Sequence, residues 1–138
     1  MRRSPQSTRY PKVTGSMTAD AFCAACPSRA LLARLGEKWT VLALTALAEG
    51  PARFGALKRR LEGVSQKMLT QSLRALERDG LVMRAVLDRR PLAVEYRLTP
   101  LGSELVPLVD AIKRWSEATL PQVAEANRRF DVLETERA

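Results

Sequence analysis

Apolar residues recur every three or four positions through the first half of the chain, which is the period of a helix with one buried face. Serine, proline and glycine mark the ends of the segments that carry this pattern. The spacing predicts helices over Ser28–Leu35, Lys38–Glu49, Phe54–Leu61 and the segment between Ser65 and Gly80. Their expected core residues are Ala30, Leu31, Leu35, Trp39, Leu42, Ala43, Ala46, Leu47, Phe54, Leu57, Leu61, Leu69, Leu73 and Leu76.

The pattern changes after Gly80. Two segments rich in β-branched and aromatic residues, Leu81–Leu87 and Ala93–Leu98, predict strands. The charged segment Asp88–Leu92 between them predicts a hairpin loop. A threonine–proline pair at positions 99 and 100 then offers an N-cap and a first-turn proline for another helix.

This next helix carries an apolar stripe. Its members stand at alternating steps of four and three, as along a coiled-coil seam, and they are Leu101, Leu105, Leu108, Ile112 and Trp115. The stripe is too apolar to remain in water, so we expect it to form a dimer interface. Pro107 lies inside the helix, where a proline can bend it. A last, separate helix is expected over Pro121–Leu133.

The order of these elements is that of a winged helix-turn-helix. The sequence therefore predicts a mainly α fold of the α+β class, with a two-stranded β wing and with dimerisation helices at the N- and C-terminal ends. Three parts are expected along the chain. They are a flexible basic arm over residues 1–20, a winged domain over 21–120 and a helical extension over 121–138.

The helix between Ser65 and Gly80 presents a polar and basic face opposite its leucines. In a winged helix-turn-helix, this helix enters the major groove, where glutamine suits adenine and arginine suits guanine. Lysine and threonine suit phosphates, and arginines at the tip of the wing suit the minor groove. The candidate DNA-binding residues are Ser65, Gln66, Lys67, Thr70, Gln71, Arg74, Arg89 and Arg90. The alternative is an ordinary amphipathic helix whose polar face meets only water.

The distribution of charge favours a nucleic-acid partner. The net charge is +8, divided as +3 over residues 1–22, +7 over 23–100 and −2 over 101–138. The basic excess therefore belongs to the arm and the predicted winged domain, and a one-sided basic field attracts polyanions. The alternative, if only the charge is considered, is a basic surface that contacts nothing but water.

Residue types that carry catalysis are scarce. The chain has no histidine, the commonest general base and metal ligand, and it lacks a glycine-rich phosphate loop and a nucleophile elbow. We therefore expect neither an enzyme nor a cofactor. No apolar run approaches the roughly 20 residues of a membrane helix, and the charged N-terminus is not followed by an apolar segment. We expect a cytoplasmic protein.

Residues from Cys26 to Trp115 resemble a known family. Cys26-Pro27, Gly36-x-Lys38-Trp39, Arg53-Phe54, Ser65-x-Lys67-x-Leu69-Thr70, Leu76-Glu77, Gly80-Leu81, Val94-Glu95-Tyr96-x-Leu98-Thr99 and Gly102 follow one another as in the HxlR-type winged-helix transcriptional regulators of bacteria, relatives of the MarR group. The resemblance implies a homodimer that binds palindromic operators, often as a repressor. It also implies sensing of electrophiles or oxidants, in some members through the cysteine that corresponds to Cys26. The long arm, Glu37 in place of a glycine, and the additional Cys23 depart from the family pattern.

The two cysteines are candidates for a redox sensor. Cys26 stands at the start of a predicted helix, where free N–H groups and the helix dipole favour a thiolate, and Arg29 lies one turn further on. Cys23 is a possible second thiol for a disulfide. The alternatives are that Cys26 is a small buried apolar residue, or that cysteines from two subunits share a zinc ion. With two cysteines and no histidine, we expect no metal site within one chain.

The leading hypothesis is a dimeric, sequence-specific DNA-binding regulator whose affinity for DNA changes when Cys26, alone or with Cys23, is modified. A second hypothesis keeps DNA binding but gives the cysteines no role. A small apolar ligand then binds in a pocket between the dimer helices and the winged domain. A third is a winged-helix module that only contacts proteins, which leaves the basic field of the middle segment unused.

Overall fold

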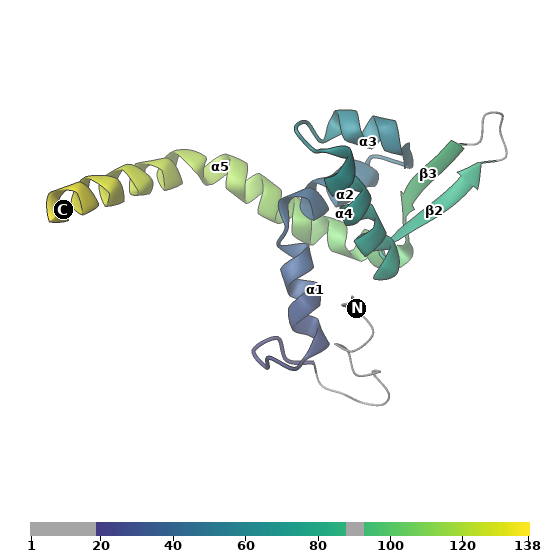
Figure 1. Ribbon diagram of the computed structural model, residues 1–138, viewed down its shortest axis with the longest axis horizontal. Coiled ribbons are helices and arrows are strands. Elements are labelled where there is room, and N and C mark those ends of the chain that lie inside the picture. The colour runs from purple at the N-terminus through teal and green to yellow at the C-terminus, as the bar shows by residue number, and fades with distance from the viewer. Residues whose placement is uncertain (1–18, 88–92) are drawn as a thin grey trace, which may run out of the picture.

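The computed structural model describes residues 19–87 and 93–138. Its elements are α1 (Pro27–Leu35), α2 (Lys38–Ala48), β1 (Ala52–Arg53), α3 (Phe54–Arg60), α4 (Gln66–Arg78), β2 (Val82–Leu87), β3 (Ala93–Leu98) and α5 (Pro100–Arg137). Helices α2, α3 and α4 and the sheet lie together, while α1 and the distal part of α5 extend away from them (Figure 1). The predicted winged helix-turn-helix fold is confirmed. Most of the predicted basic arm and the hairpin loop Asp88–Leu92 lie outside the described residues.

One hydrophobic core holds α2, α3, α4, β2 and the start of α5 together. The three leucines predicted to face inward from α4, Leu69, Leu73 and Leu76, are 0–1% exposed. Helix α2 contributes Trp39, Ala43 and Leu47 as predicted, and also Leu44, which the periodicity did not single out. The other predicted core residues of α2 and α3 are buried or pack against this cluster.

Helix α1 differs from the prediction. None of its residues is buried, and Leu31 is 42% exposed, so the expected core role of Ala30 and Leu31 is wrong. Only Leu35, in the last turn, packs against the core. The physical reason is that α1 projects from the domain and reaches it only at this turn, which leads into α2 (Figure 1). Helical spacing of apolar residues predicts an apolar face but not whether the same chain covers it.

The sheet has a third strand that the sequence did not reveal. The strand order is β1-β3-β2, with all pairs antiparallel, and Ala52 of β1 pairs with Tyr96 of β3. β1 has two residues, too few for an alternating pattern to be visible. The two wing strands pair from Val82 opposite Leu98 to Leu87 opposite Ala93.

Helix α5 runs without interruption over 38 residues, so the separate helix predicted from Pro121 is wrong. Pro107 and Pro121 both lie inside it. A proline removes one intrahelical hydrogen bond, which weakens a helix without always ending it. The change of direction of α5 in Figure 1 is of the kind that an internal proline produces.

The start of α5 is fixed against the end of α4. Thr99 caps α5 by accepting a hydrogen bond from the Gly102 N–H, and its hydroxyl donates to the Gly80 carbonyl at 2.6 Å. A Cβ atom at position 102 would lie 2.0 Å from the Leu81 carbonyl oxygen, so only glycine allows this close approach. The end of α4 is therefore tied to the first turn of α5 through Gly80 and Leu81.

Candidate nucleic-acid interface

Helix α4 begins at a well-formed cap. The Ser65 hydroxyl accepts a hydrogen bond from the Met68 N–H at 3.1 Å, as predicted for an N-cap serine. The inner face of α4 is anchored by its three leucines and by Ser72, which is 6% exposed. A helix fixed in this way presents its opposite face in a defined orientation.

The opposite face collects the five helical residues that the sequence singled out, Gln66, Lys67, Thr70, Gln71 and Arg74. All five are exposed. Lys67, Gln71 and Arg74 follow one another at steps of four and three, so they form one row along the helix. Arg78 extends this row by another step of four and is also exposed. The sequence prediction missed Arg78, although the same spacing rule predicts its place.

Basic residues also gather at the end of α3, the helix before the turn. Lys58, Arg59 and Arg60 occupy its last turn and are all exposed. Arg60 forms an ion pair with Glu49, the C-cap of α2, at 2.8 Å. The hydrogen bond and the opposite charge lower the pKa of Glu49 and raise the pKa of Arg60, so both groups stay ionised. In helix-turn-helix proteins, the helix before the recognition helix crosses the DNA backbone.

The wing contributes further cations along its strands. Arg84 of β2 and Arg97 of β3 are exposed, and Arg97 is paired with Glu95 at 3.1 Å. The predicted wing residues Arg89 and Arg90 lie outside the described residues.

The Cys26 thiol lies at the N-cap position of α1. Its sulfur accepts a hydrogen bond from the Asp20 N–H at 3.3 Å and lies 3.1 Å from the Ser28 hydroxyl oxygen. The hydrogen bond with the Ser28 side chain, followed by hydrogen bonds with the backbone of Ser28 and Asp20, lowers the pKa of Cys26 below its ordinary range. A lower thiol pKa increases the share of reactive thiolate at neutral pH.

The surroundings of Cys26 differ from the prediction in one respect. Arg29 turns its guanidinium to the carbonyl oxygens of Ala21 and Phe22, both at 3.0 Å, and so holds the segment before α1. It is not among the groups that shift the pKa of Cys26. Cys23 is exposed in the same segment, and its carbonyl accepts a hydrogen bond from the Cys26 N–H.

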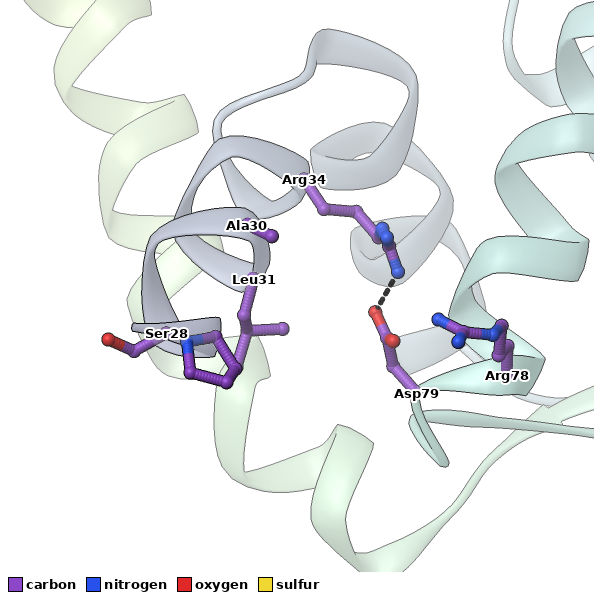
Figure 2. Close-up of a pocket in the computed structure, with 7 residues that line it drawn as sticks. Ser28, Ala30, Leu31, Arg34, Arg78 and Asp79 are labelled. Atoms are coloured by element: carbon purple, nitrogen blue, oxygen red, sulfur yellow. Dashed lines mark hydrogen bonds and ion pairs between the residues drawn. The ribbon is translucent and has the colours of Figure 1, made fainter. Parts of the chain in front are cut away.

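An ion pair joins α1 to the end of α4. Arg34, in the last turn of α1, reaches the carboxylate of Asp79, the C-cap of α4, at 2.5 Å. Figure 2 shows Arg34 and Leu31 on the α1 side, and Asp79 with Arg78 on the other. These residues line a hollow of about 450 Å³. The two side chains of the pair are 24% and 18% exposed, so solvent screens them only in part.

Four of the five residues of the α5 stripe are exposed. Leu101, Leu108, Ile112 and Trp115 are 52–63% exposed, whereas Leu105 packs against the core. The face of α5 that enters the core is an adjacent one, which contains Gly102 and Val109. An apolar stripe beside the core face therefore lies on the surface of the single chain.

Residues 19–87 and 93–138 contain no group of three or more His, Cys, Asp or Glu residues placed to hold a metal ion. In the same part of the chain, none of the helices combines the length and apolar character that crossing a membrane requires.

Comparison with known proteins matches this chain to helix-turn-helix transcriptional regulators in sequence and in structure. The family model described as HxlR-like helix-turn-helix matches residues 34–124. The HTH-type transcriptional regulator YtfH of Escherichia coli K12 is 48% identical over 102 residues, which are 74% of this chain and 81% of that protein. The structure of the transcriptional regulator ytfH from Salmonella typhimurium gives a TM-score of 0.76 at 44% identity, covering 80% of this chain and 99% of that one. The redox regulator HypR in its oxidized form gives 0.62 at 39% identity, covering 67% and 96%.

Proposed function

Since the chain belongs to the HxlR-like helix-turn-helix family, whose members are DNA-binding transcriptional regulators and not enzymes, we propose that α4 is the helix that reads DNA in the major groove. The observation that carries this proposal is the division of α4 into two faces. Its leucines are buried, and the row Lys67, Gln71, Arg74 is exposed on the opposite side. A regulator of this kind works where the chromosome is, so we place it in the cytoplasm.

The residues of this face divide by chemistry. The Gln71 amide has the donor and acceptor that suit adenine, and the Arg74 guanidinium has the two parallel donors that suit guanine. Lys67, in the first turn, carries a point charge that suits a phosphate. Gln66 and Ser65 stand at the N-terminus of α4, where free N–H groups add to the attraction for phosphate. Arg89 and Arg90 of the wing remain candidates for the minor groove.

We propose that the regulator is a homodimer on a palindromic operator. The exposed stripe on α5 is continued toward the C-terminus by Phe130 and Leu133, each more than half exposed. A contiguous apolar surface of this kind marks an interaction site. A second copy of the chain covers it by the coiled-coil spacing of the stripe and sets the two α4 helices about one DNA turn, roughly 34 Å, apart.

We further propose that the regulator is a repressor that responds to oxidants or electrophiles through Cys26. The lowered pKa of the thiol supports this, as does the likeness to HypR, which is a redox regulator. An electrophile adds directly to the Cys26 sulfur. Alternatively, Cys26 and Cys23 join as a disulfide and give two electrons and two protons to an oxidant of the diamide type. Either change alters the start of α1, and the Arg34–Asp79 pair links this helix to α4.

A second candidate for the effector is a small, largely apolar ligand. A cleft of about 540 Å³ lies between α2, α3 and α5, with Leu42, Ala46 and Val106 in its wall. Charged residues surround them, namely Glu49, Arg60, Glu62, Asp110 and Lys113. The cleft therefore lies between the winged domain and the helix that carries the dimer stripe. A ligand bound here would change the angle between them without any role for the cysteines.

Operator binding by purified protein tests these proposals. Wild type is expected to bind a duplex from its own upstream intergenic region better than a scrambled duplex. Arg74→Ala should lose roughly 1–3 kcal/mol of that preference, and Lys67→Ala should weaken binding to all sequences equally. Arg114→Ala on α5 removes the same charge away from α4 and serves as the control. Equal binding by all these variants would show that another surface meets DNA.

The effector is tested with the same duplex. Diamide should weaken binding by wild type, with recovery in dithiothreitol, and should leave Cys26→Ser unaffected. Cys23→Ser distinguishes a disulfide from an adduct, because only the disulfide needs the second thiol. An equal response of wild type and Cys26→Ser would overturn the thiol switch and favour the ligand cleft.

A further inference from the structure

We propose that the methyl group of Thr70 reads the C5 methyl group of a thymine, so that an A·T pair with its thymine under the second turn of α4 is part of each half-site. The inference rests on the proposed function, because it assigns a base to a residue of the proposed recognition helix. It concerns Thr70 because the polar group of this side chain is already in use within the helix.

The hydroxyl of Thr70 is committed to its own helix. It donates to the Gln66 carbonyl oxygen at 2.7 Å. A threonine hydroxyl has a single proton, and phosphate oxygens only accept hydrogen bonds. The phosphate contact that the residue type suggested for Thr70 would therefore require this intrahelical bond to break. The other branch of the side chain, the Cγ2 methyl, remains for an external partner.

The same hydrogen bond fixes the position of the methyl. A threonine side chain turns about χ1 only, and a hydroxyl held by the carbonyl four residues earlier defines that angle. The methyl group is therefore oriented before any DNA arrives. A contact made by a pre-oriented group does not cost side-chain entropy on binding.

The neighbours of Thr70 bring it to the groove. Lys67 precedes it by three residues and Arg74 follows it by four, so all three lie side by side on the exposed face of α4. The two cations are attracted to DNA, and the short threonine between them does not hold the helix away from the base edges. The thymine methyl projects into the major groove, where a threonine methyl is one of its usual apolar contacts.

The chemistry of Gln71 leads us to expect an A·T pair as well, at the same or the adjacent base pair. Its amide suits the N6 and N7 atoms of adenine, and every adenine is paired with a thymine that presents a methyl group in the same groove. Thr70 and Gln71 are consecutive and both exposed. One A·T pair, or two adjacent ones, can therefore satisfy both residues.

Replacing thymine by deoxyuridine tests this inference, because it removes the methyl group and changes no hydrogen-bonding atom. Each thymine of a mapped half-site is replaced in turn, in both half-sites at once. For wild type, one such replacement should weaken binding by about four-fold per half-site, the value of one buried methyl group. A replaced thymine outside the half-sites should have no effect and is the control.

Two variants connect that loss to Thr70. Thr70→Ser keeps the hydroxyl and removes the methyl, so it should bind the thymine duplex as weakly as wild type binds the deoxyuridine duplex and should lose nothing more on replacement. Thr70→Val keeps a methyl and removes the hydroxyl, so it should retain the sensitivity to deoxyuridine. Both substitutions are at an exposed position, and circular dichroism checks that helix content is unchanged.

The outcomes separate this inference from the proposed function. If wild type prefers the operator but tolerates deoxyuridine at every position, or if Thr70→Ser is as sensitive as wild type, then α4 reads DNA without the Thr70 methyl. If wild type binds operator and scrambled duplexes equally, the proposed function fails, and the assignment of Thr70 fails with it.

Discussion

Helix α4 and the distal part of α5 carry similar apolar spacings but have different surroundings. In α4 the leucines are fully covered by the same chain, and apart from Met68 the exposed side chains are polar. Over positions 111–137 of α5 no residue is buried, although Trp115, Leu120 and Phe130 are large and apolar. One chain is therefore sufficient to fix α4, whereas the distal part of α5 exposes apolar side chains to solvent in the single chain.

The largest difference between the two regions should appear in folding stability. Leu73→Ala removes a fully buried side chain and should lower the free energy of unfolding by about 2–5 kcal/mol, because it leaves a cavity in the core. Ile112→Ala removes a similar group from an exposed stripe, so its cost should depend on how much of the protein is dimeric. Urea unfolding at two protein concentrations measures both. A loss in Ile112→Ala as large as in Leu73→Ala at high dilution would show that the stripe belongs to the core.

Dimerisation should be sensitive to charge on the stripe. Ile112→Lys places an ammonium group where an apolar partner is expected, and the cost of burying an unpaired charge should weaken the dimer by a factor on the order of 100 or more. Ala118→Lys adds the same charge away from the stripe and should leave the dimer intact. Sedimentation velocity over a range of concentrations separates the two variants. A dimer of Ile112→Lys as tight as wild type would require a different interface.

The contrast also explains what sequence alone can predict. The α4 prediction was confirmed in its N-cap at Ser65, its buried leucines and the exposure of its polar residues, because local capping and one-sided burial both act within a few turns. The continuity of α5 through Pro121 was missed, because a proline after a polar segment reads equally well as the start of a new helix. β1 was missed because its two residues depend on pairing with β3, far along the chain.

Helix α1 failed as a core prediction for a related reason. Its apolar residues have helical spacing, but the spacing does not show whether the same chain buries them. Leu31 and Leu32 are in fact exposed. The Arg34–Asp79 link to α4 was not predicted, because the two residues are 45 positions apart and each is an ordinary surface charge in the sequence. Arg78, in contrast, was within reach of the spacing rule that selected Arg74.

The ion pair offers a smaller test of how α1 depends on α4. Asp79→Asn removes the charge that holds Arg34, and for a partly exposed pair the loss of global stability should be about 1 kcal/mol or less. The larger effect should be local, as faster amide hydrogen exchange in α1. Glu49→Gln breaks the exposed pair with Arg60 and changes the net charge equally, so it is the matched control. Unchanged exchange in α1 of Asp79→Asn would mean that the packing of Leu35 alone positions this helix.

The smallest expected effect concerns the Cys26 thiol at the far end of α1. The Ser28 hydroxyl is the largest contributor to its lowered pKa, so Ser28→Ala should raise that pKa toward the ordinary range. Because the thiolate is the reactive form, alkylation of Cys26 by iodoacetamide should then be a few times slower at neutral pH and equally fast well above the pKa. The rate is measured against pH in a Cys23→Ser background, with Ser103→Ala on α5 as a control for the loss of a serine. The midpoint of the profile should move to higher pH in Ser28→Ala alone. A profile that does not move would show that the backbone hydrogen bonds at the start of α1 are sufficient to activate the thiol.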